Sequence, residues 1–303
     1  MQSSLQVKRK KTVNYWPYAM LAPWIIGFTL FKVYPIAVSF WNSLFEYTSF
    51  SMILGEPPEF IGLANYIKIF TDDPTFNRSI VATLKYVLFG TPCVLIAAFV
   101  VAFVLNFKLK GVNFFRTAYY IPSILGGNVA VSILWTMLFN VNGPVNMVLG
   151  AFGAQPVNWI KDPTFAVVTL IVLKTWQFGS TMLIFLSALQ NVSASLYEAA
   201  SLDGAGKTRQ LFSITLPIIT PMLLFNAVNV LVKAFQEFNS AYLITKGGPN
   251  HSTYFLNVYI YDQAFIGGNY GYASALTWVL LAIIGILTAL VFSSSKYWVY
   301  YND

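Results

Sequence analysis

Long uncharged apolar segments constrain this chain more than any other feature. Residues 87–105, VLFGTPCVLIAAFVVAFVL, and residues 273–292, ASALTWVLLAIIGILTALVF, contain no charged side chain. A helix of about 20 mostly apolar residues spans the hydrocarbon core of a bilayer. Across the 303 residues, 57% are hydrophobic and only 10% are charged, whereas a soluble domain has about 25% charged residues. The sequence therefore predicts a membrane protein.

Six segments are long and apolar enough to be membrane-spanning helices, which predicts an all-α membrane protein. The expected spans are residues 17–44, 79–106, 114–138, 164–190, 217–243 and 271–295. The first is the least regular, because Lys32 and two prolines, Pro23 and Pro35, interrupt it. It is nevertheless too long to be the apolar core of a cleaved signal peptide.

Basic residues predict the orientation, because cytoplasmic segments carry most lysines and arginines. With the amino terminus inside, the cytoplasmic segments hold Lys8, Arg9, Lys10, Lys11, Lys108, Lys110, Arg116, Lys207, Arg209 and Lys296. The outer segments hold Lys68, Arg78, Lys161 and Lys246, together with most of the acidic residues, including Asp162 and Asp262. Both termini are therefore expected in the cytoplasm, with residues 1–15 as a basic tail that contacts anionic lipid rather than nucleic acid.

The chain has one cysteine, Cys93, and one histidine, His251. A single cysteine excludes a disulfide within the chain, and a structural metal site built from histidine and cysteine needs several such ligands. We therefore expect no metal site, and interpret Cys93 as a small hydrophobic residue.

The segment EAASLDGAGKT, Glu198 to Thr208, falls in the cytoplasmic loop between the fourth and fifth expected spans. Its end, Gly-Lys-Thr, matches the end of a phosphate-binding loop. That motif also needs a glycine five residues before Gly206, where the chain has Ser201, and it should follow a buried strand. The glycine is missing, and the segment before Glu198 has a helical pattern rather than that of a strand. The nucleotide-binding interpretation therefore fails on both counts.

A short helix is the alternative interpretation of this loop. Ser195 and Glu198 have the spacing of a capping box, and the residues that follow favour a helix. Gly204 and Gly206 then allow the backbone to turn. From this pattern alone, the helix is either an ordinary capped loop helix or a small-residue face that docks into a partner.

The longer segment EAASLDGAGKTRQLFSITLPIITP closely resembles the E-A-A-x-x-D-G-A motif, followed by I-x-L-P, of permease subunits of binding-protein-dependent ABC importers. FIGLANYIKIF (60–70), YLITKGGP (242–249) and YGYASAL (270–276) are similar to segments of the carbohydrate-uptake subfamily. With the basic tail, the Y-L-x-T-x-G-G-P element resembles the first permease of a heterodimeric pair of the maltose and glycerol-3-phosphate type. The resemblance covers nearly the whole chain.

The resemblance implies a single permease domain over residues 16–303, with a family core of about 75–295 and a coupling loop at 195–217. The residues implied to contact the ATPase are Glu198, Ala199, Ala200, Asp203, Gly204, Ala205 and Gly206. It implies no catalytic residue and no cofactor in this chain, because ATP and Mg would be bound by the ATPase. The implied partners are a second homologous permease, two ATPase subunits or domains, an extracytoplasmic solute-binding protein, a carbohydrate and membrane lipid. The implied location is the cytoplasmic membrane of a bacterium or archaeon, which the chain crosses several times.

Polar side chains inside the expected spans are candidates for the substrate path, because such groups rarely face lipid. The candidates are Trp176, Gln177, Ser180, Lys233 and Glu237. An aromatic ring packs on the apolar face of a sugar, and amide and hydroxyl groups exchange hydrogen bonds with its hydroxyls. The alternatives are that Trp176 is a packing or membrane-interface residue and that Lys233 and Glu237, four residues apart, form a structural ion pair.

Two other functions remain to be distinguished. A secondary carrier driven by an ion gradient could use Lys233 and Glu237 as titrating groups, but it would leave the coupling-like loop unexplained. A permease of the same family could instead carry another solute, such as glycerol phosphate.

Overall fold

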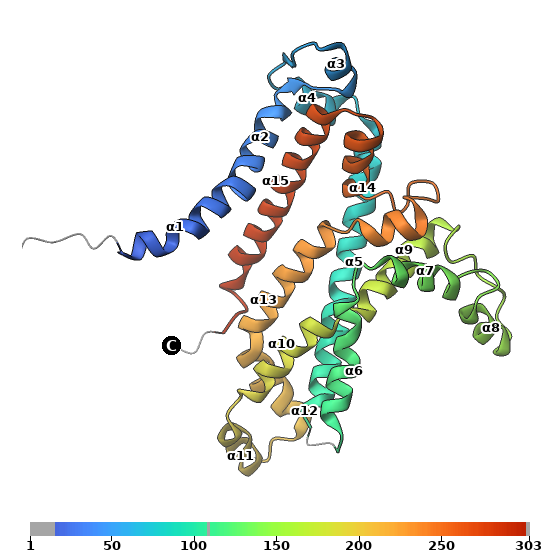
Figure 1. Ribbon diagram of the computed structural model, residues 1–303. Coiled ribbons are helices and arrows are strands. Elements are labelled where there is room, and N and C mark those ends of the chain that lie inside the picture. Colours follow the sequence, from blue (N-terminus) through green and yellow to red (C-terminus); the bar gives the residue numbers. More distant parts are fainter. Residues whose placement is uncertain (1–15, 108–109, 301–303) are drawn as a thin grey trace, which may run out of the picture.

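Long helices running side by side form most of this computed structural model, which describes residues 16–107 and 110–300. The basic cluster at residues 8–11 and Lys108 lie outside the described residues. Figure 1 shows a bundle with α3 and α4 at one end and α11 and α12 at the other, and with the first helix splayed away from the rest.

Four continuous helices are long and apolar enough to cross a membrane. They are Met20–Ser43, made by α1 (Trp16–Phe28), η1 (Thr29–Val33) and α2 (Tyr34–Ser43); α5 (Pro74–Leu105); Lys207–Phe235, made by α12 (Lys207–Gln210), η2 (Leu211–Thr215) and α13 (Leu216–Phe235); and α15 (Tyr270–Ser295). The η segments are single π-helical turns inside these helices.

Two further helix pairs are each bent at a short break. Helices α6 (Val112–Ile124) and α7 (Val129–Leu138) are bent by 102°, and α9 (Pro163–Trp176) and α10 (Gly179–Gln190) by 47°. The described part of the chain therefore has four candidate spans, or up to six if each bent pair counts as one. The third expected span, 114–138, is not one straight helix, and the fifth begins ten residues earlier than expected (217 − 207 = 10).

Shorter elements connect these helices. They are β1 (Phe45–Glu46), α3 (Ser49–Leu54), β2 (Glu59–Phe60), α4 (Ala64–Thr71), α8 (Pro144–Ala151), α11 (Ala194–Leu202), η3 (Ala241–Thr245), α14 (Leu256–Tyr261) and η4 (Asp262–Ile266). Strands β1 and β2 pair antiparallel, with Phe45 opposite Phe60. This two-stranded sheet corrects the expectation of an all-α chain, although the fold is mostly helical.

Helix α5 is the central element, and its sequence explains both its start and its packing. The Asp73 carboxylate caps it by accepting hydrogen bonds from the backbone N–H groups of Thr75 and Phe76, both at 2.9 Å, and Pro74 suits the first turn. Farther along, the small residues Ala98 and Ala102 are fully buried. Small side chains let helices approach closely in membranes, and here α10 and α13 pack on α5.

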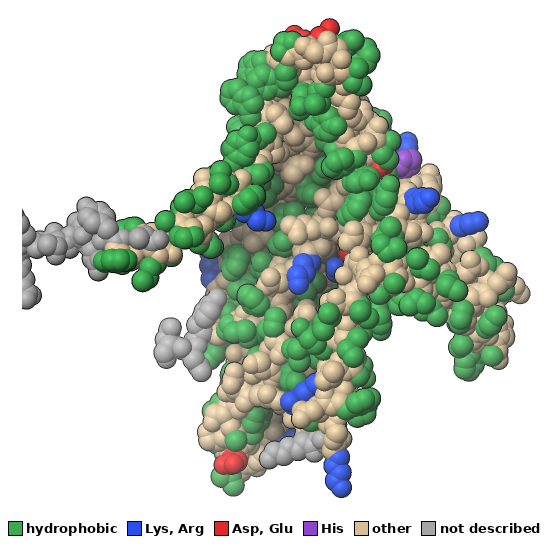
Figure 2. All heavy atoms as spheres, viewed as in Figure 1, with side chains coloured by type: hydrophobic (Ala, Val, Ile, Leu, Met, Phe, Trp, Pro, Cys, Tyr) green, Lys and Arg blue, Asp and Glu red, His purple; other side chains and the backbone are tan. Residues whose placement is uncertain are grey.

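Two buried clusters stabilise the bundle at different levels. One gathers Tyr86 and Phe255 with residues of α15, and the other gathers Met182 and Phe185 of α10 with α5. Outside these clusters, large apolar side chains cover the exterior (Figure 2). In lipid such a surface needs no cover, because the hydrocarbon is as apolar as the side chains.

Candidate functional site

A polar cavity of about 360 Å³ lies at the meeting point of three helix breaks. The first is the α6–α7 break at Gly126 and Gly127, the second is the α9–α10 bend at Gln177, and the third is the end of α13 at Gln236. Irregular backbone at membrane depth occurs where it is buried in protein or lines a water-filled cavity. The breaks therefore create the polar lining that straight apolar helices could not supply.

An ion pair joins two of the elements that line this cavity. The Lys174 ammonium of α9 lies 3.1 Å from a Glu237 carboxylate oxygen, beyond the end of α13. The other oxygen of Glu237 accepts hydrogen bonds from the backbone N–H of Ser240 (3.2 Å) and from its hydroxyl (2.7 Å). Glu237 is thus held from both sides. Of the two alternatives for Lys233 and Glu237, the ion pair between them is wrong, because Glu237 pairs with Lys174 of α9 instead.

Four of the five predicted path residues line this cavity, namely Gln177, Ser180, Lys233 and Glu237. The Ser180 hydroxyl donates a 3.1 Å hydrogen bond to the hydroxyl of Ser123 on α6. Lys233 is exposed and forms no salt bridge within residues 16–107 and 110–300. The structure thus brings together side chains from α9, α10 and α13 that are far apart in the sequence.

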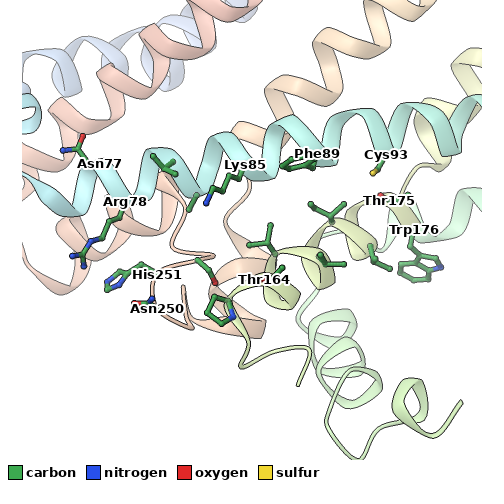
Figure 3. Close-up of a pocket in the computed structure, with 18 of the residues that line it drawn as sticks. Asn77, Arg78, Lys85, Phe89, Cys93, Thr164, Thr175, Trp176, Asn250 and His251 are labelled. Atoms are coloured by element: carbon green, nitrogen blue, oxygen red, sulfur yellow. The ribbon is translucent and has the colours of Figure 1, made fainter. Parts of the chain in front are cut away.

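Trp176 is the predicted path residue that does not line the polar cavity. Its side chain is 39% exposed and its ring lies 5.6 Å from that of Trp135. It lines a separate, larger cavity between α5 and α9 (Figure 3). A role for Trp176 in the path stays a prediction.

Several cavity residues were not predicted from the sequence, among them Ser123, Asn128 and Asn239. A signal for the α6–α7 break, where Asn128 lies, was present in Gly126-Gly127-Asn128. Two glycines followed by asparagine mark a turn and a new helix start. Gly127 has a φ of +75°, and the Asn128 side chain caps α7 by accepting from the N–H of Ala130 at 2.9 Å.

The predicted coupling loop forms a short projecting helix. Helix α11 and α12 lie at the end of the molecule opposite α3 (Figure 1). Every described residue of α11 is at least partly exposed, and Leu202 is 90% exposed. Helix α11 is therefore only loosely packed against the rest of the described chain.

The predicted capping box of α11 is wrong. The helix begins at Ala194, so Ser193 rather than Ser195 occupies the N-cap position, and no side-chain capping bond forms there. The two serine hydroxyls instead hydrogen-bond each other at 2.7 Å. Because Ser195 lies inside the helix, Ser195 and Glu198 no longer occupy the N-cap and third helical positions that a capping box requires.

The turn after α11 forms at the expected glycine. Gly204 has a φ of +77°, in the left-handed region that favours glycine. The N–H of Ala205 then donates to the carbonyl of Ala200 at 2.8 Å. The buried Gln210 side chain donates to the Ser201 hydroxyl (2.9 Å) and the Ala205 carbonyl (3.0 Å), which ties α12 to the loop. Because Ser201 is within α11, the segment is helical where a phosphate-binding loop would have to turn.

Comparison with known proteins gives the family. Residues 75–301 match the family described as binding-protein-dependent transport system inner membrane component. The chain is 44% identical to the probable ABC transporter permease protein YesP of Bacillus subtilis (strain 168), covering 100% of this chain and 96% of that protein. It is 33% identical to the lactose transport system permease protein LacF of Rhizobium radiobacter, covering 97% and 98% respectively.

The fold also matches a solved structure. A chain from the crystal structure of a bacterial ABC transporter involved in the import of the acidic polysaccharide alginate superposes with a TM-score of 0.74, at 24% identity. The match covers 93% of this chain and 95% of that chain. This protein therefore belongs to the family of inner membrane components of binding-protein-dependent transport systems, and it is a multi-pass membrane protein.

Proposed function

We propose that this protein is a permease subunit of an ABC importer that takes up a sugar or oligosaccharide. The observation that carries the proposal is the polar cavity between the helix breaks, in a chain whose relatives include a lactose permease and a multiple-sugar permease. Sugar hydroxyls both donate and accept hydrogen bonds, so they need side chains that do the same. Gln177, Ser180 and Asn239 offer such groups at the cavity surface.

The proposed path uses the broken helices as its moving parts. Transporters commonly place substrate near interrupted helices and alternate access by moving helices about that site. The Lys174–Glu237 pair links the α9–α10 bend to the end of α13. It would keep these two elements in register while a sugar passes along Gln177, Ser180 and Lys233.

Energy would come from ATP hydrolysed, with Mg, on two ATPase subunits or domains. Helix α11, through Glu198, Ala199 and Ala200, would dock into them, and the turn from Asp203 through Gly204 and Ala205 to Gly206 would set its angle. The exposure of α11 and of Leu202 supports this role. Both chain termini and α11 would then face the cytoplasm.

Two further partners complete the proposed importer in the cytoplasmic membrane of a bacterium or archaeon. One is a second, homologous permease, which would cover part of the exposed surface of this chain and close the path. The other is an extracytoplasmic solute-binding protein that delivers the sugar. A structural relative was solved in complex with an alginate pentasaccharide-bound periplasmic protein, which supports such a partner.

A non-sugar solute is the second candidate, favoured by one observation. Lys233 adds a positive charge to the cavity without a carboxylate partner in the described chain, and a cation suits a phosphate. A relative at 31% identity is the sn-glycerol-3-phosphate permease UgpA of Shigella flexneri.

Reconstitution tests these alternatives. The chain is purified with its second permease and ATPase and placed in proteoliposomes with the binding protein. We expect uptake of labelled oligosaccharide that requires ATP and persists when ion gradients are collapsed. Competition by glycerol phosphate but not by sugars would assign the second candidate, and uptake driven by an ion gradient alone would refute the importer. ATP crosslinking to Lys207 in the isolated permease would refute the coupling role of α11.

A further inference from the structure

A groove of about 1220 Å³ lies between α5 and α9, separate from the polar cavity. On α5 its lining follows one helix face, with Arg78, Lys85, Phe89 and Cys93 at spacings of three or four residues or their multiples. On α9 it is lined mostly by apolar residues, from Pro163 to Trp176, together with Thr164 and Thr175. Most of the groove is hydrocarbon-like.

Positive and polar groups gather at one end of this groove. Figure 3 shows Arg78, Asn250 and His251 at that end, with Cys93 and Trp176 at the other. The Lys85 side chain extends from α5 toward the end that holds Arg78 and His251 (Figure 3). No aspartate or glutamate lines the groove, and neither Arg78 nor Lys85 forms a salt bridge within the described ranges. The groove therefore has a positively charged end near Arg78 and Lys85 and an apolar end near Cys93 and Trp176.

The dimensions match one leaflet of a membrane. From Arg78 to Cys93 the α5 axis rises about 22 Å, at about 1.5 Å per residue. The hydrocarbon core is about 30 Å thick, so this length covers a headgroup region and roughly one leaflet. A long lysine side chain placed between the two zones can direct its ammonium toward the headgroups.

We propose that this groove binds an anionic phospholipid, such as phosphatidylglycerol. The phosphate lies between Arg78 and Lys85, where His251 and Asn250 add hydrogen-bond donors. One acyl chain follows α5 and α9 past Phe89 to Cys93 and Trp176. The site is independent of the transported solute.

A second copy of this chain fits the groove less well. Its helix Met20–Ser43 is apolar and largely exposed. Residues 16–43 contain no aspartate or glutamate, so this helix would cover Arg78 and Lys85 without neutralising them. A phosphate does neutralise them.

Photocrosslinking tests the proposal in the full chain, reconstituted into nanodiscs with the subunits it purifies with. Phosphatidylglycerol carrying a diazirine at the end of one acyl chain is compared with phosphatidylcholine carrying the same chain. We expect adducts on the α5 segment 89–93 and the α9 segment 172–176, with phosphatidylglycerol favoured roughly thirtyfold, as two cations at about 1 kcal/mol each near an anionic lipid predict. Equal yields from the two lipids would overturn the proposal.

Variants separate headgroup recognition from simple filling of the groove. Arg78→Gln with Lys85→Gln should abolish the preference, whereas Lys161→Gln, an exposed cation outside the groove, should keep it. Val172→Trp should reduce adducts from both lipids by filling the apolar part. If the double variant still prefers phosphatidylglycerol, the proposed headgroup site is wrong. The proposal is also wrong if the groove is occupied by another subunit and gives no lipid adducts. Excess inorganic phosphate should leave the yield unchanged, and competition by it would assign the cations to a soluble anion instead.

Discussion

Glu237 shows how much one side chain depends on partners from other helices. Its side chain is 11% exposed, and its carboxylate is held by Lys174 of α9 and by Ser240, three residues farther along the chain. A carboxylate placed so deep in an apolar bundle is tolerated when it is paired. Removing Lys174 or Ser240 therefore leaves the Glu237 carboxylate less well paired in a poorly hydrated place.

Replacing one member of the Lys174–Glu237 pair should therefore destabilise the protein more than exchanging the two charges. We expect Lys174→Met and Glu237→Gln each to lower stability by about 1–3 kcal/mol, the cost of an unsatisfied buried polar group. Lys174→Glu combined with Glu237→Lys should recover part of that loss. Thermal unfolding of the purified permease in detergent measures the effect. An exchanged protein no more stable than either single variant would show that the ion pair contributes nothing.

Asp73 is another buried carboxylate held by groups from several helices, at the end of the bundle that carries α3 and α4. One oxygen caps α5, and the other accepts hydroxyl hydrogen bonds from Tyr259 of α14 (2.6 Å) and Tyr272 of α15 (2.5 Å). Burial alone would raise the pKa of Asp73, but hydrogen bonds from the two tyrosines and two backbone N–H groups hold this pKa below its ordinary value of 3.8. The charged form therefore stabilises the junction of three helices.

This lowered pKa predicts a pH-dependent stability. The contribution of Asp73 is complete above about pH 5 and is lost as the pH falls through the lowered pKa, because the folded state then has to take up the proton. Asp73→Asn, which can still cap α5, should lower the melting temperature at pH 7 and should differ less from the parent protein as the pH approaches 3. Asp72→Asn, at an exposed position, is the control. A difference that is constant with pH would contradict the role of the charge.

Helices that run straight were predictable from the sequence, and helices that break were not. The long apolar run of α5 sufficed to place it, with the cap at Asp73 extending it to Pro74. The segment 114–138 is also apolar enough to predict a span, yet it turns by 102° between α6 and α7. Hydropathy cannot separate one span from two half-helices, because both bury apolar residues. Only the local turn signal at Gly126-Gly127-Asn128 distinguishes them.

The same limit applies to the candidate site. Four cavity residues were predicted because polar groups in apolar spans are few, so each one stands out. Their pairing was not predictable, since Lys174 and Glu237 are 63 residues apart. The local rule for residues four apart favoured Lys233, and contact between two helices overrode it. The turn at Gly204 was predicted because backbone geometry there depends on the residue itself.

Gly204 allows the proposed coupling element to be tested. A Cβ added at this position meets no other atom of this chain within 4 Å, so a new side chain would strain the backbone or clash with a partner. A left-handed conformation costs an ordinary residue about 1–2 kcal/mol, and asparagine tolerates it best. We expect Gly204→Val to abolish uptake and to release or uncouple the ATPase, and Gly204→Asn to retain more uptake. Vesicle transport and ATPase assays measure both effects, and normal uptake by a stable Gly204→Val protein would refute the coupling role.

As a whole, the molecule is polarised between its two ends. Helix α11 and Lys207 lie at one end, and the β1–β2 hairpin, α3 and α4 lie at the other (Figure 1). The expected orientation puts α11 in the cytoplasm, where an ATPase could reach it, and the hairpin outside. The distribution of lysines and arginines predicts this orientation, and the proposed function requires it, since ATP is available on one side only.

Cysteine labelling tests the orientation with substitutions that the structure makes safe. Asp162 caps α9 and Asp262 accepts a hydrogen bond from Tyr254, so exchanging these outward-predicted residues would disturb the fold. Lys161 and Lys207 are exposed instead. With Cys93, the only native cysteine, replaced by serine, Lys161→Cys should react with a membrane-impermeant maleimide in intact cells. Lys207→Cys should react only after the membrane is opened, because the reagent cannot reach the cytoplasmic end. Labelling of position 207 from outside would show that the molecule has the opposite orientation. In that orientation α11 could not meet an ATPase in the cytoplasm.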